Sequence, residues 1–467
     1  MQDIYEFAKK EELDLIHEYS MKILNETGVS FMGEEAVEIF KRHGFKVDGH
    51  TVFMNESDVM KALKTVPKQF DWHGRDSHVV MGGGITICAP AYGPMYILED
   101  GEFHMPTRDD FIKFSKLNAT SKTHQASNPN MMDLSFMPSE IASNWAMATT
   151  LMLNTKPAIG MVDGRKSAID SINMAQEFYG LKDKNVVCSL ISIASPLRYS
   201  VAMCEALIEY AKRGQSVMIS PAGMGGLTLP DSMAGALLVN NTEILAGIVL
   251  AQLINPGTPT VYGNQTHGTD LRYTVPCEGS PEQSLFFHSA KAFGKYYGNI
   301  PVRTGGVLSD AKQVDMQAGV ESFSTCYATL HSGADIMLHS GGGLDSNNTL
   351  SYDKYIYDEE VVMTVQRMLR GIEVNEETLQ LARIQKVGPG GDFIGKTSKL
   401  YRNDYLALNI PNRTAHSIWI NDGAETIVQR TKKAYQKRLA EYVIPELDAE
   451  RKAILERYVP AKTLITQ

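Results

Sequence analysis

The sequence is poor in cysteine and lacks the short motifs that bind metals or activate nucleophiles. Five cysteines are spread over 467 residues, and no two of them form a CxxC pair. An odd and widely spaced set is a poor disulfide framework, so we expect free thiols. The patterns HxxxH, HxH and HExxH are absent, as are the GxSxG and Walker motifs. We therefore expect no metal bound by this chain and none of the machinery of an ordinary hydrolase.

The sequence also lacks a basic excess and a signal segment. Lys and Arg number 45 against 54 Asp and Glu, which gives a formal net charge of -9. With no basic cluster to offset this charge, we expect neither a nucleic-acid nor a membrane partner. The first 14 residues are acidic and amphipathic, and no run of about 18 apolar residues occurs. We expect a cytoplasmic protein.

What is present is the composition of a folded chain and a repeated strand-helix pattern. Apolar residues make up 43% and charged residues 21% of the chain. Eight extended candidates each precede a helical pattern, at residues 95–98, 123–128, 156–164, 185–192, 216–223, 259–264, 300–306 and 334–343. These candidates are almost continuously apolar, which is typical of parallel strands buried on both faces.

Eight such units favour a (β/α)8 TIM barrel. An open doubly wound sheet remains the alternative, although no GxGxxG sequence follows the early strands. We predict an N-terminal helical and hairpin extension over residues 1–90, the barrel over 91–372, and a C-terminal helical extension over 373–467 that packs on the barrel. The length fits two or three domains as well as one large barrel with extensions.

The connection within residues 259–283 is unusually long and polar. A short apolar run, PTVYG, is followed by Gln265, His267, Asp270 and Glu278 before a helical pattern resumes. Most strand-to-helix connections span only a few residues, so a polar loop of this length is typical of a functional segment.

Barrel active sites lie at the carboxyl ends of the strands, so residues that follow each apolar run are expected to converge. They are Asn128, Asp163, Ser192, Ser195, Ser220, Gln265, His267, Arg303, Thr304, His339 and Ser340. Tyr92, Tyr96, Tyr273, Tyr352, Tyr355 and Tyr357 fall in or near the same loops. Tyrosines at a barrel mouth would suit a quaternary ammonium group, at roughly 0.5–2 kcal/mol for each cation–π contact. Arg272 or Arg303 would then bind a carboxylate of the same ligand.

Three blocks of sequence carry a resemblance to a known family. They are NTEILAGIVLAQLINPGTPTVYG at 241–263, GSPEQ at 279–283, and TGGVLSDAKQVDMQAGVES at 304–322 followed by SGADIMLH at 332–339. These blocks resemble the trimethylamine methyltransferase superfamily, whose members are (β/α)8 barrels of similar size. The founding members use pyrrolysine, whereas this sequence holds only standard residues and is similar to the non-pyrrolysine branch.

The resemblance implies a methyltransferase that demethylates a quaternary amine, with glycine betaine as the expected substrate and proline betaine or carnitine as alternatives. The methyl group would pass to Co(I) of a corrinoid cofactor carried by a separate corrinoid protein. The family also implies a homo-oligomer. A quaternary ammonium leaves as a neutral tertiary amine, so positioning rather than acid or metal catalysis is required.

Within this hypothesis we predict His339 and His267 as the catalytic, substrate-orienting residues. The predicted substrate-binding residues are Tyr92, Tyr96, Gln265, Arg303 and Tyr352, with Asp310 and Lys312 as lesser candidates. Two alternative hypotheses remain: a betaine-binding or corrinoid-scaffolding protein without turnover, and a zinc-dependent corrinoid methyltransferase. The latter, acting on methanol or methylthiols, would need Cys and His ligands that converge on one face, and Cys88, Cys277 and Cys326 do not have the spacing of a zinc site.

Overall fold

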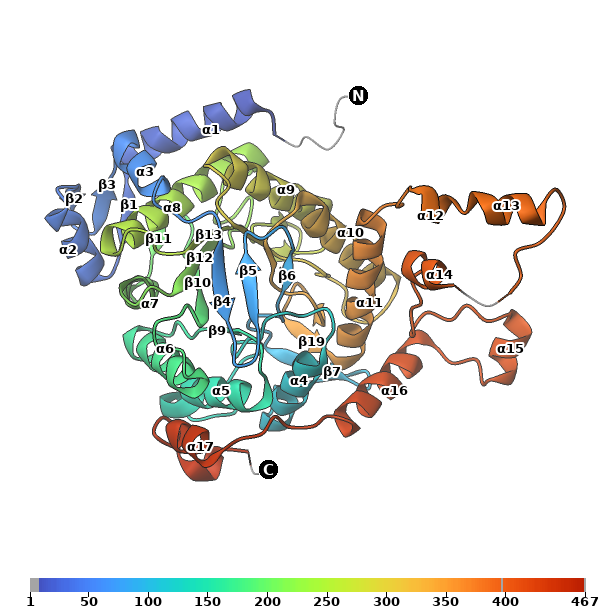
Figure 1. The fold of residues 1–467 in the computed structure, drawn as a ribbon. Helices are drawn as coiled ribbons and strands as arrows, with labels where there is room; N and C mark the ends of the chain where they lie inside the picture. Colours follow the sequence, from blue (N-terminus) through green and yellow to red (C-terminus); the bar gives the residue numbers. More distant parts are fainter. Residues whose placement is uncertain (1–7, 396–397, 466–467) are drawn as a thin grey trace.

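A curled parallel sheet surrounded by helices forms the centre of the computed structural model, which describes residues 8–395 and 398–465 (Figure 1). The strand order is β6-β17-β16-β13-β12-β10-β9, and every pairing is parallel. The bounds are β6 Ile87–Cys88, β9 Ala158–Ile159, β10 Val187–Ile193, β12 Ser216–Pro221, β13 Thr260–Gly263, β16 Val302–Thr304 and β17 Ile336–Met337. This TIM-like sheet confirms the predicted α/β class.

Residues 123–128 bridge the two edge strands of this sheet. The amide of Ser127 donates to Pro157 O at 2.8 Å, and the amide of Ile159 donates to Ser127 O at 2.9 Å beside β9. On the other side, the amide of Gln125 donates to Cys88 O of β6 at 3.0 Å. Backbone hydrogen bonds therefore run around the sheet from one edge to the other.

The prediction for the first strand of the barrel was wrong. Residues 95–98 were expected to open it, but β7 (Tyr96–Glu99) belongs to a second sheet of order β18-β19-β7-β8. The other strands of that sheet are β8 Glu102–His104, β18 Gly343–Leu344 and β19 Thr349–Ser351. The first strand of the central sheet is β6, which precedes the predicted boundary at residue 91. Part of the predicted N-terminal extension is thus the start of the central sheet.

A hairpin, β4 (Phe70–His73) with β5 (His78–Met81), closes the amino-terminal end of the sheet. Trp72 and Met81 are fully buried and pack with inward-facing residues such as Val261 and Ile336. The indole N–H of Trp72 donates to Val186 O, directly before β10, at 3.3 Å. The opposite, carboxyl end of the sheet is not covered by this hairpin.

The remaining N-terminal elements form a small lobe against α8 (Met233–Ile254). They are α1 Lys10–Lys22, η1 Ile23–Thr27, β1 Val29–Phe31, α2 Glu34–Arg42, β2 Lys46–Asp48, β3 Thr51–Phe53 and α3 Glu56–Leu63. Strand β1 pairs with β11 (Arg198–Tyr199) from the connection that follows β10.

Helices cover the outer face of the sheet (Figure 1). Besides α8 they are α4 Arg108–Thr120, α5 Ser139–Leu153, α6 Arg165–Tyr179, α7 Val201–Lys212, α9 Pro281–Tyr296, α10 Met316–Ser332 and α11 Tyr352–Leu369. The block GSPEQ begins α9, because Ser280 accepts the amide of Gln283 and Pro281 occupies the first turn. By length and composition α8 could cross a membrane, but 72% of its most apolar window is buried inside the protein. We interpret α8 as a core helix.

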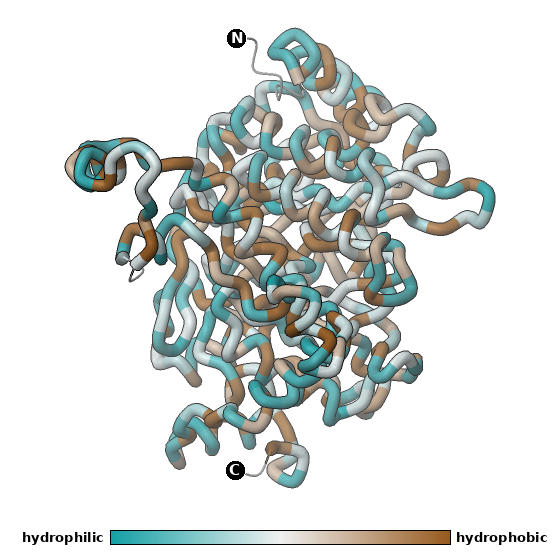
Figure 2. Tube along the Cα trace, turned by 90° about the vertical axis from the view of Figure 1, so that its right-hand side faces the viewer, coloured by the Kyte–Doolittle hydropathy of each residue, from teal (hydrophilic) through white to brown (hydrophobic). Residues whose placement is uncertain are grey.

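The C-terminal extension has two parts with different packing. Helices α16 (Ile427–Ala440) and α17 (Ala449–Glu456) pack on α11 and α6 respectively, and a short helix, η2 (Ala461–Thr463), follows. The helices α12 Glu376–Leu379, α13 Leu381–Val387, α14 Lys399–Asp404 and α15 His416–Asn421 instead project away from the barrel (Figures 1 and 2). We call this projecting segment, residues 372–395 and 398–425, the arm. None of its four helices contains a buried residue.

Candidate active site

Four of the predicted site residues are buried where the barrel strands end. Gln265 and His267 follow β13, Arg303 lies on β16, and His339 follows β17. Their exposed fractions are between 1% and 6%. Parallel strands bring their carboxyl ends to one face of a barrel, so these side chains occupy the face opposite the β4–β5 hairpin.

Arg303 reaches across a glycine to a neighbouring strand. Gly263 pairs with Arg303, and a side chain at Gly263 would meet Ser220 of β12, since a Cβ atom there would lie 2.5 Å from Ser220 Cβ. The absent side chain leaves room for Arg303 Nη1 to donate to Ser220 Oγ at 3.1 Å. Arg303 Nε is buried and has no hydrogen-bond partner among the described residues. Burial lowers the pKa of Arg303 to about 9.

Glu278 brings a carboxylate into the same region. It follows β15 (Val275–Cys277), the second strand of a hairpin whose first strand is β14 (Gly268–Asp270). Its own amide donates to Asp310 Oδ1 at 2.8 Å, which fixes the backbone. Oε2 of Glu278 is buried without a partner in the described chain. Burial, with Asp310 adding to the effect and Arg303 opposing it, raises the pKa of Glu278 to about 8.

His267 stands at the other base of this hairpin. Nδ1 of His267 donates to Gly268 O at 2.9 Å, so the neutral ring carries its proton there and Nε2 can accept. Nε2 lies 3.9 Å from Glu278 Oε1. Burial lowers the pKa of His267, and the ring is therefore neutral near pH 7.

His339 is held by the loop that contains Tyr92. Its backbone has a φ of 62°, in the left-handed region that is costly for a residue with a side chain. Nδ1 accepts the amide of Tyr92 at 3.3 Å, and Asn347 donates to Tyr92 O at 2.9 Å. Burial and the nearby charge of Arg303 lower the pKa of His339 to about 3. This histidine is neutral as well.

The amide of Gln265 completes the group of unpartnered polar atoms. Both its Oε1 and its Nε2 are buried without a partner among the described residues. The amide lies over Gly305, where a Cβ atom would come within 2.4 Å of Oε1. Asn347 Oδ1 is likewise buried and unpartnered. Native proteins rarely leave such atoms unsatisfied, so this cluster is typical of a ligand site.

Two glycine-rich loops beside the site are fixed by one buried ion pair. Lys354 and Asp358 of α11 lie 2.6 Å apart, and the side chain of each is 1% exposed. Lys354 Nζ also donates to Val307 O at 2.8 Å, and Asp358 accepts the amide of Gly342 at 2.8 Å. The pair thus ties the loops after β16 and β17 to one helix, which indicates a structural role for both loops.

Comparison with known proteins identifies the family. A family profile described as trimethylamine methyltransferase (MTTB) matches residues 2–464. The chain is also 36% identical to the glycine betaine methyltransferase of Desulfitobacterium hafniense (strain Y51), over 97% of this chain and 96% of the relative.

The chain belongs to the trimethylamine methyltransferase family.

Two further relatives of similar identity come from Eubacterium limosum. Its proline betaine:corrinoid methyltransferase is 34% identical and its L-carnitine:corrinoid methyltransferase 33% identical, each over 97% of both chains. Among solved structures, the hydroxylamine complex of MtmB has a TM-score of 0.56 at 14% identity, covering 96% of this chain and 91% of that one. This structural likeness supports the TIM-like fold, and the family makes the chain a methyltransferase.

Two of the predicted substrate-binding tyrosines do not join the site of this family member. Tyr352 is fully buried, stacks on Phe114 with ring centroids 4.2 Å apart, and donates to Asp110 at 2.7 Å. These contacts give Tyr352 a role in packing α11 against α4. Tyr96 lies on β7 in the second sheet and is 39% exposed. Tyr92 contributes its backbone, and burial raises the pKa of its hydroxyl.

Glu278 and Asn347 were not predicted as site residues. Neither directly follows a strand of the central sheet, so the strand-end rule does not select them. Glu278 returns to the site only because the β14–β15 hairpin folds back. The length and polarity of residues 259–283 were the only signal in the sequence, and they indicate the segment rather than the residue.

The cysteines do not gather into a zinc site in the described chain. Cys88 and Cys326 are fully buried, and Cys277 lies in the hairpin. One group of potential metal ligands, Glu99, His104 and Asp110, lies by the second sheet and away from the strand ends. Both oxygens of Asp110 already accept hydrogen bonds, from Thr107 and Tyr352.

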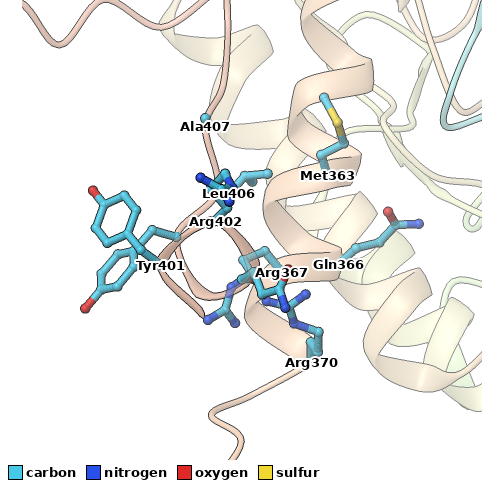
Figure 3. Close-up of a pocket in the computed structure, with 10 residues that line it drawn as sticks. Met363, Gln366, Arg367, Arg370, Tyr401, Arg402, Leu406 and Ala407 are labelled. Atoms are coloured by element: carbon cyan, nitrogen blue, oxygen red, sulfur yellow. The ribbon is translucent and has the colours of Figure 1, made fainter. Parts of the chain in front are cut away.

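A groove of about 650 Å³ lies between α11 and α14 (Figure 3). Its arginines hold backbone of the arm: Arg367 Nε donates to Asp404 O at 2.6 Å, and Arg370 donates to Asn403 O. Both arginines bind the chain itself, and both are far in sequence from the residues that follow the strands of the central sheet. We therefore interpret the groove as the place where the arm attaches to α11.

Proposed function

We propose that this chain demethylates a quaternary amine, most specifically glycine betaine, and passes the methyl group to a corrinoid protein. The observation that carries the proposal is Arg303, a buried guanidinium whose Nε has no partner among the described residues and whose cluster includes the neutral rings of His267 and His339. A carboxylate would satisfy this donor. Glycine betaine, proline betaine and carnitine, the substrates named for three relatives, each carry a carboxylate and a quaternary ammonium.

The reaction requires this chain to bind the substrate, to orient it and to exclude water from it. Arg303 and Gln265 would hold the carboxylate, and the neutral rings of His267 and His339 would line the site without repelling the cation. The tertiary amine leaves without protonation, so no acid is needed. The reduced corrinoid of the partner protein supplies the nucleophile. His267 and His339 are only 4% and 6% exposed, which suits substrate contact rather than ligation of a cobalt on another protein.

The fold and partners follow from the same proposal. We interpret the seven paired strands, with residues 123–128 between the edges, as a complete (β/α)8 barrel with N- and C-terminal extensions. The methyl acceptor would approach the carboxyl end of that barrel, since the β4–β5 hairpin covers the other end. Glycine betaine is preferred over the other two betaines because the corresponding relative is the most similar of the three at 36% identity.

The decisive experiment mixes the protein with a Co(I) corrinoid protein and a panel of quaternary amines. Loss of the Co(I) absorption with glycine betaine, together with formation of dimethylglycine, supports the proposal. The same result only with proline betaine or carnitine would correct the substrate. Tight betaine binding without any spectral change would show a binding or scaffolding protein, and activity lost on chelation would show zinc chemistry.

The His339→Ala variant tests the assignment of the site. We expect its kcat/KM for glycine betaine to fall by roughly 10- to 100-fold, because the ring is fixed by Tyr92 and positions the substrate. Replacing Cys277 by alanine is the control, because that thiol lies in the hairpin and donates to the backbone oxygen of Val275 in the same strand. Equal effects of the two substitutions would refute the site.

A further inference from the structure

The candidate site contains a buried carboxyl group, that of Glu278, in addition to the buried cation Arg303. Oε2 of Glu278 is buried and has no partner in the part of the chain that the structure describes, and Asp310 adds a second carboxylate nearby. Arg303 is the cation that acts on Glu278, and its own Nη1 is bound to Ser220. A ligand that is only an anion would satisfy Arg303 and leave Glu278 without a partner.

We propose that Glu278 recognises the quaternary ammonium group of the substrate and is the residue that selects a zwitterion over an anion of the same shape. This inference rests on the proposed function and deepens it. A zwitterion brings one charge of each sign, so its carboxylate would pair with Arg303 and its ammonium with Glu278. Both unpartnered groups would then be satisfied by one small molecule.

The surroundings of Glu278 show why its carboxylate is available. Its neighbours are His267, with Nε2 at 3.9 Å, Asp310 and Arg303. Asp310 already accepts the amides of Glu278 and Gly279 and the hydroxyl of Ser346. Glu321, from α10, accepts the hydroxyl of Ser309 at 2.7 Å. These other carboxylates are engaged by hydrogen bonds, whereas Oε2 of Glu278 is not.

The proposal predicts that binding releases a proton. With a pKa of about 8, Glu278 is mostly protonated near pH 7 in the free protein. A permanent cation beside the carboxylate favours the ionised form and lowers that pKa. Glu278 therefore loses its proton to the buffer as the betaine binds, whereas an uncharged group at the same place leaves the proton bound.

Two ligands of the same shape separate charge from fit. Glycine betaine and 3,3-dimethylbutyrate differ by a carbon in place of the ammonium nitrogen, so both present a carboxylate to Arg303 but only the first is a cation. Calorimetric titration near pH 7 in two buffers of different ionisation enthalpy gives the affinity and the protons released. We expect the native protein to prefer glycine betaine by roughly tenfold to a hundredfold and to release a proton with that ligand only.

The Glu278→Gln variant should bind both ligands with similar affinity and release no proton. Its affinity for 3,3-dimethylbutyrate serves as the folding control, and Glu278→Asp should retain part of the preference. The matched control is Glu282→Gln, which changes an exposed carboxylate four residues along and should behave as the native protein. An unchanged preference and proton release in Glu278→Gln would overturn the inference.

The two proposals fail in different ways. Methyl transfer with a Glu278→Gln variant that still prefers betaine would refute the role of Glu278 and leave the proposed function intact. A native protein that shows the preference and the proton release, yet transfers no methyl group, would refute the proposed function alone. A native protein that binds none of glycine betaine, proline betaine and carnitine would refute both.

Discussion

At the scale of residues, the candidate site is a place where buried polar atoms lack partners. Arg303 Nε, Glu278 Oε2 and both amide atoms of Gln265 are in this state in the described chain. Each such atom costs about 1–3 kcal/mol relative to a satisfied one. A fold retains this cost where a ligand supplies the missing partners, and a guanidinium together with a carboxyl group that can ionise indicates a ligand that carries both signs.

The Arg303→Lys variant tests whether Arg303 binds the substrate carboxylate through the planar pair of donors of its guanidinium or only through its positive charge. Lysine keeps a positive charge but lacks the planar donor pair, and its amine loses its proton more readily when buried. We expect the KM for glycine betaine to rise by roughly tenfold or more while kcat changes less. Steady-state kinetics measure both. Arg272→Lys, in the exposed Asp270–Arg272 pair of the hairpin, is the control and should leave KM unchanged.

At the scale of elements, the sequence was sufficient for long apolar strands and insufficient for short ones. Strands β10 and β12 are buried on both faces, and their unbroken apolar runs predicted them. Strand β6 has only two residues and follows a glycine-rich turn, so local pattern favoured β7 instead. The Asp100–Gly101 turn that joins β7 to β8 has positive φ at both residues, which is typical of a hairpin and not of a strand-to-helix connection.

The same limit applies to the site. Arg303 lies in a strand of the central sheet, and His267 and His339 follow such strands, so topology alone brings them together. Tyr352 is the first residue of α11, and its side chain packs against α4. The sequence does not indicate which neighbouring helix a side chain in the first turn of a helix will contact. Glu278 depends on how a hairpin folds back over the barrel, which is a tertiary property.

The central helix α8 contains a buried acid that should make stability depend on pH. Glu243 accepts the amide of Leu197 at 2.7 Å and the hydroxyl of Ser195 at 3.0 Å, and burial raises its pKa to about 7. Because the folded state holds this proton more tightly than the unfolded state, the free energy of unfolding falls as pH rises from about 4.5 through about 7.

Glu243→Gln should remove this dependence. Glutamine can keep both hydrogen bonds, since its oxygen accepts from Leu197 and its amide donates to Ser195 Oγ. We expect the variant to match the native protein near pH 5 and to exceed its free energy of unfolding by about 1–3 kcal/mol near pH 8. Denaturant titrations at the two pH values measure the difference. A variant less stable than the native protein at both values would contradict the pKa assignment.

At the scale of the whole molecule, the arm is the segment that leaves many apolar side chains exposed. Its exposed apolar side chains are Ile372, Val374, Leu379, Leu381, Ile384, Phe393, Ile394, Tyr401, Tyr405, Ile418 and Ile420. Glu360 of α11 accepts the amides of Asn409 and Ile410, and Arg367 and Arg370 at the end of the same helix bind backbone at Asp404 and Asn403, so the arm is attached along α11. Apolar surface of this extent on a projecting segment is typical of a protein interface.

We expect a second copy of this chain to cover the arm, in keeping with the homo-oligomer that the family resemblance implies. A two-fold interface places the same surface on both copies, so the exposed apolar side chains of one arm would be covered by those of the other. Light scattering coupled to size-exclusion chromatography should give a mass that is a multiple of one chain.

In Ile384→Asp with Ile394→Asp, two carboxylates would be buried without partners, and the association should weaken by roughly 100-fold or more. Ile85→Asp is the control, because Ile85 is 73% exposed and lies outside the arm. A monomeric native protein, or an arm variant that associates as tightly as the control, would show that the arm serves another partner.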